Sequence, residues 1–137
     1  MKLKKQKQPD GAGVILYQDF DGSRQLLVML KPNGKFDIPK GHCDITDLNV
    51  FATAQRECWE EVGIFFTKLD LITNEEYFDG KLSVFCAKTD QMPKLKENPD
   101  TGEAEHVGWF WVEPHTAINL LPNYLSKAVV WSLQQFE

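Results

Sequence analysis

The sequence predicts a mixed α/β (α+β) sandwich, and three observations lead to that fold class. Short apolar segments separated by turn-forming residues recur along the chain and indicate strands. Two longer segments carry apolar residues three and four positions apart and indicate helices. The chain has 137 residues, the size of one domain, and 42% of them are hydrophobic, so it can bury a core without disulfides.

The first predicted elements are strands. Residues 13–17 and 25–30 are apolar, and the turn sequence 19–22 between them predicts a hairpin. A second turn at 31–34 leads to a short extended piece over 35–39, which Pro39 closes.

Residues 47–62 have the pattern of a helix with one apolar face. Either Thr46 or Asp47 can cap its start, and Gly63 follows where a left-handed residue commonly ends a helix. The apolar stripe consists of Phe51, Ala54, Cys58 and Val62.

The second half of the chain alternates strands, a loop and a final helix. Residues 64–71 are apolar and β-like, and residues 75–78 and 81–87 flank Asp79-Gly80 as a second hairpin. Residues 91–102 are polar and predict a loop, and 107–112 predict a strand. A helix is expected over 119–135, with Pro122 in its first turn. Its stripe is Leu120, Leu121, Tyr124, Ala128 and Trp131.

Composition and charge exclude several classes of protein. Fifteen basic and twenty acidic residues give a net charge of −5, which argues against binding to long nucleic acids. No apolar run approaches the ~20 residues of a membrane span, so we expect no membrane partner. The three cysteines, Cys43, Cys58 and Cys86, have no CxxC spacing, which favours a reducing cytoplasm over a disulfide or zinc framework.

The chain ends suggest a simple division. Four lysines within residues 1–7 are not followed by a signal-peptide core. We expect residues 1–10 to be a basic tail or the start of the first strand, and residues 11–137 to be a single domain that is monomeric or homodimeric.

Three carboxylates crowd one face of the helix predicted over 47–62. Glu57 and Glu61 are four positions apart and Glu60 is three from Glu57, so all three project from adjoining parts of that face. They repel one another and lie at the negative end of the helix dipole, where only Arg56 is placed to pair with Glu60. A solvated acidic face is one interpretation. A site for a divalent cation such as Mg²⁺, which prefers oxygen ligands, is the other.

Residues 41–64 resemble the signature box of the Nudix hydrolases. The second half of the box matches from Arg56 through Gly63 to Ile64, with Cys58 where the family has an aliphatic residue. The resemblance implies a Nudix-type α/β/α sandwich, in which a central mixed sheet is flanked by the box helix and a C-terminal helix.

The first half of the box departs from the family pattern. The spacing from Gly41 to Arg56 is one residue longer, and the expected glutamate is absent. Asp47 is the nearest acid and Asp44 a weaker candidate, which indicates one inserted residue in the loop before the helix. That family glutamate is mainly structural, so catalysis need not be lost.

The resemblance also implies roles for individual residues. Glu57, Glu60 and Glu61 would bind Mg²⁺ or Mn²⁺, with Arg56 orienting them and Gly41 letting the backbone turn close to the metal. A further acid outside the box, as metal ligand or general base, would be Glu105, with Glu103 second. Lys40 would reach a substrate phosphate or be merely solvated, and His106 would be either a base or polar surface.

The stretch 36–42, Phe-Asp-Ile-Pro-Lys-Gly-His, is similar to the subgroup that cleaves diadenosine polyphosphates asymmetrically. The alternatives are a MutT-like nucleoside triphosphate pyrophosphatase, an RNA 5′-pyrophosphohydrolase and a catalytically silent nucleotide-binding module. A nucleobase needs an aromatic platform. Tyr77 and Tyr124 are preferred over Phe78 and Phe85, because their hydroxyls tolerate a partly wet site.

Overall fold

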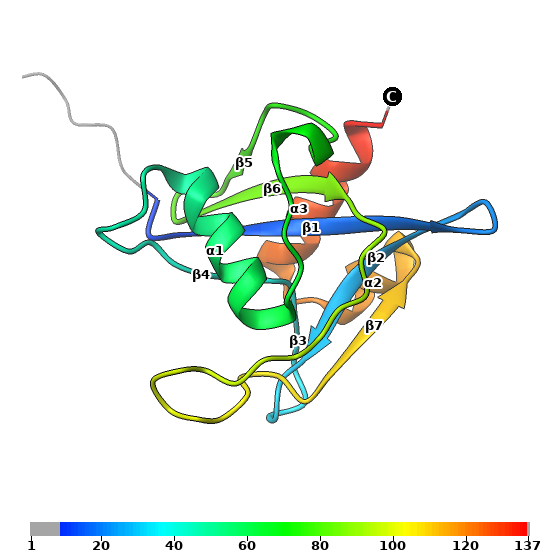
Figure 1. Ribbon diagram of the computed structural model, residues 1–137. Coiled ribbons are helices and arrows are strands. Elements are labelled where there is room, and N and C mark those ends of the chain that lie inside the picture. Colours follow the sequence, from blue (N-terminus) through cyan, green and yellow to red (C-terminus); the bar gives the residue numbers. More distant parts are fainter. Residues whose placement is uncertain (1–8, 137) are drawn as a thin grey trace, which may run out of the picture.

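The computed structural model describes residues 9–136 and shows a helix–sheet–helix sandwich (Figure 1). The seven-stranded sheet has the order β3-β2-β1-β6-β5, with β4 paired to β1 and β7 paired to β2. Because β1 runs parallel to β6 and antiparallel to β2, the sheet is mixed, as predicted. Residues 1–8, the predicted basic tail, lie outside the described residues, so the division between residues 1–10 and 11–137 stays a prediction.

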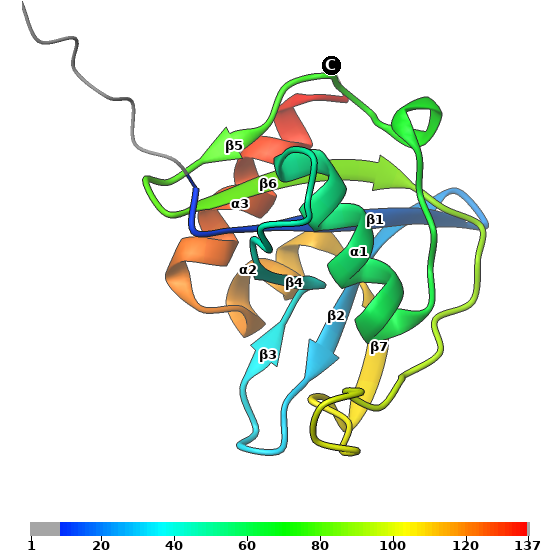
Figure 2. The same cartoon turned by 60° about the vertical axis from the view of Figure 1, so that its left-hand side comes forward.

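The central strand β1 (Gly11–Phe20) explains the layered architecture. Val14 and Leu16 pack into the core on one face of the sheet, and Ile15 and Tyr17 pack into the core on the other. A strand that is buried on both faces is apolar at successive positions rather than at alternate ones. Helix α1 (Val50–Val62) covers the first face, and α2 (Pro114–Leu120) and α3 (Asn123–Gln134) cover the second (Figure 2).

Both predicted hairpins are confirmed. Strand β1 pairs with β2 (Ser23–Leu30) through Asp21 and Gly22, whose positive φ angles of 49° and 83° suit a tight two-residue turn. Strand β5 (Tyr77–Phe78) pairs with β6 (Leu82–Lys88).

The strand predicted over 107–112 and the loop at 91–102 are also present. The strand is β7 (Gly108–Val112), which pairs with β2 along Leu26–Leu30. Within the loop region, an isolated bridge joins Glu97 to Ala104.

The extended piece predicted over 35–39 is shorter than expected and is followed by a strand that we did not predict. Strand β3 spans Phe36–Asp37 and pairs with β2, and β4 spans Lys40–His42 and pairs with the start of β1. Pro39 separates them because it cannot donate a ladder hydrogen bond.

The predicted start of the first helix is wrong by three residues. Asn49, not Thr46 or Asp47, caps α1, and its side chain accepts a hydrogen bond from Ala52 N at 2.8 Å. The predicted apolar face is correct: Ala54, Cys58 and Val62 are buried, and the partly buried Phe51 packs against them.

The prediction of a β-like segment over 64–71 is wrong. The chain there forms a 3₁₀ turn, η1 (Lys68–Asp70), and only Leu71 makes a bridge, to Ala87. Thr67 and Asp70 form a capping box, and these local hydrogen bonds outweigh the apolar composition.

The single helix predicted over 119–135 is two helices. Pro122 has no N–H and forces Leu121 into an extended conformation, so α2 ends and α3 begins on either side of it. Of the residues predicted for the apolar face, Leu121 and Ala128 are buried, whereas Leu120 and Tyr124 are exposed. Leu125 and Val129, which were not predicted, are also buried.

The Gly63→Ala substitution tests the end of α1. Gly63 adopts φ 65°, and its N–H binds Trp59 O at 3.0 Å, so a Cβ there introduces backbone strain. We expect a loss of about 1 kcal/mol in the free energy of unfolding, measured by urea denaturation. Gly63→Asn, which tolerates this conformation better, should lose less, and an unchanged stability in Gly63→Ala would contradict this explanation.

Candidate active site

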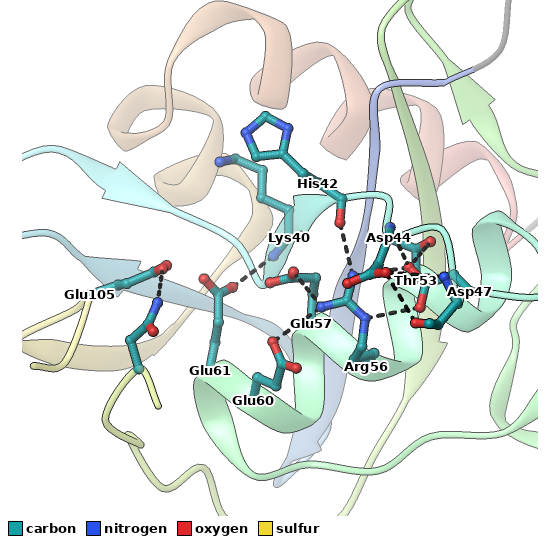
Figure 3. Close-up of polar contacts among 12 residues, drawn as sticks. Lys40, His42, Asp44, Asp47, Thr53, Arg56, Glu57, Glu60, Glu61 and Glu105 are labelled. Atoms are coloured by element: carbon teal, nitrogen blue, oxygen red, sulfur yellow. Dashed lines mark hydrogen bonds and ion pairs between the residues drawn. The ribbon is translucent and has the colours of Figure 1, made fainter. Parts of the chain in front are cut away.

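The candidate site residues lie where the last turns of α1 meet β4 and the loop before β7. Figure 3 shows the carboxylates of Glu57, Glu60 and Glu61 along one face of α1, with Glu105 reaching toward them from its loop. The side chains of Glu61, Glu105 and His106 place potential ligand atoms within 4.8 Å of one another. A cleft of about 30 Å³ lies among these residues, and this exceeds the volume that one water molecule needs.

Arg56 organises the helix end. As the spacing predicted, it pairs with Glu60, with Nη1 3.2 Å from Oε2, and the same nitrogen lies 2.9 Å from Glu57 Oε1. Its Nε and Nη2 each donate to Asp47 at 2.9 Å, and Nη2 also donates to the carbonyl of His42. All five N–H donors of the guanidinium therefore have acceptors.

Asp47 fixes Arg56 from the loop that departs from the family pattern. It accepts the two arginine hydrogen bonds, one from Thr53 Oγ1 at 2.7 Å and one from Asp44 N at 2.9 Å. The loop before the helix is therefore closed by hydrogen bonds and attached to the helix. The hydrogen bonds from Arg56 hold the pKa of Asp47 far below its usual range.

Glu61 is the most unusual acid of the group. It is only 7% exposed, and its Oε1 accepts a hydrogen bond from Lys40 N at 2.9 Å. Burial, and then the adjacent Glu105, raise the pKa of Glu61 to about 10, so Glu61 is protonated at neutral pH. The hydrogen bond between the two side chains lowers the pKa of Glu105. Burial also raises the pKa of Glu57, with Arg56 opposing it.

Gly41 lies against Glu57. A Cβ at Gly41 would collide with the Glu57 carboxylate, so a larger residue there would push this carboxylate out of its present position beside Arg56.

Lys40 is not simply a solvated lysine. Its side chain is 19% exposed, and Nζ lies 3.2 Å from Asp37 Oδ1. Although burial acts to lower the pKa of Lys40, the Asp37 carboxylate raises it above its usual value, so the amine stays charged.

The remaining predicted residues are divided between the site and other places. Tyr124 is 43% exposed and lines a cavity of about 500 Å³ together with Lys40, Gly41 and His42. Tyr77 instead packs on Trp131, with ring centroids 5.9 Å apart. Glu103 is exposed in the loop.

Sequence reasoning missed Asp37, which holds Lys40. It named Asp47 as a possible cap and as the acid nearest to the expected box glutamate, but not as the partner of Arg56. The only signal for either role was that each acid lies in the segment leading to the box helix. The surface interpretation of His106 is wrong. The His106 side chain is only 3% exposed, and its Nε2 forms a hydrogen bond with Asp37 Oδ2 at 3.1 Å.

The Asp47→Asn substitution tests the attachment of the loop. Because the pKa of Asp47 is lowered in the folded protein, its contribution to stability is present above its unfolded pKa of ~3.9 and is lost as the pH falls below that value. We expect Asp47→Asn to reduce the free energy of unfolding by about 2 kcal/mol at pH 7, and the difference from wild type to shrink in acid.

Denaturation at pH 7 and at lower pH measures this difference. Asp100→Asn, at an exposed loop position, is the matched control and should change stability by less than about 0.5 kcal/mol. A difference that does not depend on pH would contradict the explanation.

Comparison with solved structures identifies related folds. The chain is similar to a C. elegans Ap4A hydrolase in a binary complex, with 24% identity, a TM-score of 0.68, and coverage of 92% of this chain and 95% of that one. A MutT Nudix hydrolase from Burkholderia pseudomallei shows 25% identity, a TM-score of 0.56, and coverage of 95% and 99%. The E. coli dihydroneopterin triphosphate pyrophosphohydrolase shows 17% identity, a TM-score of 0.64, and coverage of 93% and 97%.

Comparison with curated protein sequences finds no significant match. A family model described as the NUDIX domain matches residues 7–131, which is nearly the whole chain. Together with the helix–sheet–helix fold, this match shows that the chain belongs to the Nudix hydrolase family.

Proposed function

We propose that this protein is a metal-dependent pyrophosphohydrolase acting on a nucleoside diphosphate linked to a further group, with diadenosine polyphosphates as the preferred substrates. The observation that carries the proposal is the convergence of Glu57, Glu60, Glu61 and Glu105 beside Lys40. Carboxylates can bind cations, and a lysine can bind a phosphate, so the site suits a polyphosphate that arrives with a divalent cation.

The residues present fit Mg²⁺ or Mn²⁺. All of these ligands are carboxylate oxygens, the type that hard cations prefer. Burial and the neighbouring Glu105 raise the pKa of Glu61, and a cation beside its oxygens would favour the charged form and take the place of the proton. When bound, such an ion neutralises charge on the phosphoryl group and lowers the pKa of water.

The protein's own groups divide the remaining tasks. Glu57, Glu60, Glu61 and Glu105 would hold the cation, and Arg56 orients Glu57 and Glu60 through Nη1. Lys40 would neutralise a substrate phosphate. We assign the general base to Glu105 or Glu60 and favour Glu105 over Glu103, because Glu105 is hydrogen bonded beside Glu61.

The cavity beside Lys40 supports a nucleoside-binding role. Its lining includes Gly11, Lys81, Leu82 and Tyr124 as well as Lys40. The half-exposed ring of Tyr124 is free to stack on a base, whereas Tyr77 is occupied by Trp131 and Phe85 is in the core.

The state of the cysteines agrees with a reducing compartment. Cys43, Cys58 and Cys86 are free thiols, which supports our proposal of a cytoplasmic protein. Among the described residues, no helix is long and apolar enough to cross a membrane.

Turnover of a substrate panel tests the activity. With Mg²⁺ we expect diadenosine tetraphosphate to give AMP and ATP. Release of pyrophosphate and a nucleoside monophosphate from nucleoside triphosphates would support the MutT-like alternative. Release of pyrophosphate from 5′-triphosphorylated RNA would support an RNA 5′-pyrophosphohydrolase. If none of these substrates is turned over in a metal-dependent reaction, the proposal is contradicted and the catalytically silent binding module is favoured.

The Glu60→Gln variant tests the cation site. Its side chain is 40% exposed, so the isosteric change should leave the melting temperature nearly unaltered while turnover falls on the order of 100-fold. Glu97→Gln, at an exposed position in the Glu105 loop, is the matched control and should keep wild-type activity. Unchanged turnover in Glu60→Gln would refute this assignment.

The Tyr124→Ala variant tests base stacking. Loss of one stacked base is worth ~1–3 kcal/mol, so KM should rise roughly 5- to 150-fold while kcat changes less. Tyr77→Phe is the comparison, because it keeps the ring packed on Trp131 and should leave KM unaltered. Steady-state kinetics with diadenosine tetraphosphate decides, and a KM that stays at the wild-type value in Tyr124→Ala would exclude this platform.

A further inference from the structure

A buried acid–histidine pair lies next to the carboxylates, and no task has been assigned so far to the bond between its two members. Asp37 and His106 are each 3% exposed, and Nε2 of the histidine is 3.1 Å from Oδ2 of the aspartate. The two residues are 69 positions apart in the chain, so the fold, not local sequence, brings them together. Burying a carboxylate costs free energy unless it has strong hydrogen-bond or charge partners, so the positions of Asp37 and His106 constrain one another.

The other oxygen of Asp37 faces Lys40. Nζ of Lys40 lies 3.2 Å from Oδ1, and within the described residues this buried oxygen has no hydrogen bond of good geometry. The ammonium charge is therefore the main compensation for Oδ1, which holds Nζ there. Lys40 is fixed at both ends, since its backbone N–H donates to Glu61.

The histidine side of the pair reaches the loop acid. Leu30 of β2 pairs with Phe36 of β3 and with Gly108 of β7, so β3 and β7 lie on opposite edges of β2. The Asp37–His106 bond thus joins the segments on both sides of β2. His106 directly follows Glu105, so this bond and the Val107 N–Leu30 O bond of 2.7 Å fix the position of Glu105 in the loop just before β7.

We propose that Asp37 is a positioning residue with two arms: its Oδ1 places the phosphate-binding amine of Lys40, and its Oδ2, through His106, places the Glu105 carboxylate. This inference rests on the roles proposed above for Lys40 and Glu105. It makes one buried carboxylate the link between the group that meets the substrate phosphate and the loop acid at the cation site.

Two substitutions separate the arms. Asp37→Asn removes the charge that holds Lys40 and keeps an oxygen for His106, so KM should rise about 10-fold with a smaller change in kcat. His106→Leu removes the donor beside Glu105, so kcat should fall about 10-fold with a smaller change in KM. His106→Gln, which can still donate to Asp37, should recover part of that loss.

Two further measurements exclude a merely structural role. Ser132→Ala breaks another buried polar contact, the 2.6 Å bond to Tyr17 on the α3 side of the sheet, and should lower the melting temperature without altering kcat or KM. In double-mutant cycles, Asp37→Asn should add little to the KM of a Lys40→Ala variant, and His106→Leu little to the kcat loss of Glu105→Gln.

The outcomes distinguish this inference from the proposed function. Absence of metal-dependent turnover in the wild-type protein rejects the proposed function and with it the positioning role. An active wild type with kcat and KM preserved within twofold in folded Asp37→Asn and His106→Leu overturns the positioning role alone. If His106→Leu does not fold, His106→Gln replaces it in the double-mutant cycle with Glu105→Gln. Non-additive effects of these two substitutions on kcat support the inference, and additive effects overturn it.

Discussion

One guanidinium makes the crowded helix end possible. Glu57 and Glu60 lie at the negative end of α1, where neither the helix dipole nor their mutual repulsion favours them. Arg56 offsets both charges directly and, by binding Asp47 and the carbonyl of His42, ties the preceding loop to the helix. The site therefore depends on a planar donor with five N–H groups, which a lysine cannot replace.

The parts of the fold that the sequence predicted are those decided by periodicity. The apolar stripe through Ala54 and Cys58 needs no knowledge of distant residues, and Asp21-Gly22 specifies its own turn. The prediction of a β-like segment over 64–71 failed because the side chains of Thr67 and Asp70 form hydrogen bonds with the local backbone. These bonds favour the 3₁₀ turn over a strand. The last helix was divided because the effect of Pro122 on the residue before it outweighed the pattern.

The part of the candidate site that lies on a single helix could be predicted from the sequence. Glu57, Glu60 and Glu61 share a helix face by spacing alone. The Glu105 loop was placed by resemblance and is next to Glu61 in the structure. Asp37 and His106 could not have been paired, because their contact requires β3 and β7 to lie on either side of β2, which is a property of the whole sheet. Tertiary pairing of this kind leaves no trace in local pattern.

The parallel pairing of β1 with β6 has a consequence for the order of assembly. Gly11 must meet Leu82 before the centre of the sheet exists, and closing such a long loop makes folding slow compared with that of helical bundles. Contacts between β4 and α1 are far closer in sequence and can form once residues 40–62 have emerged from the ribosome. During synthesis, the helix carboxylates and Arg56 would therefore associate first, and Glu105 would join them only after β7 reaches β2.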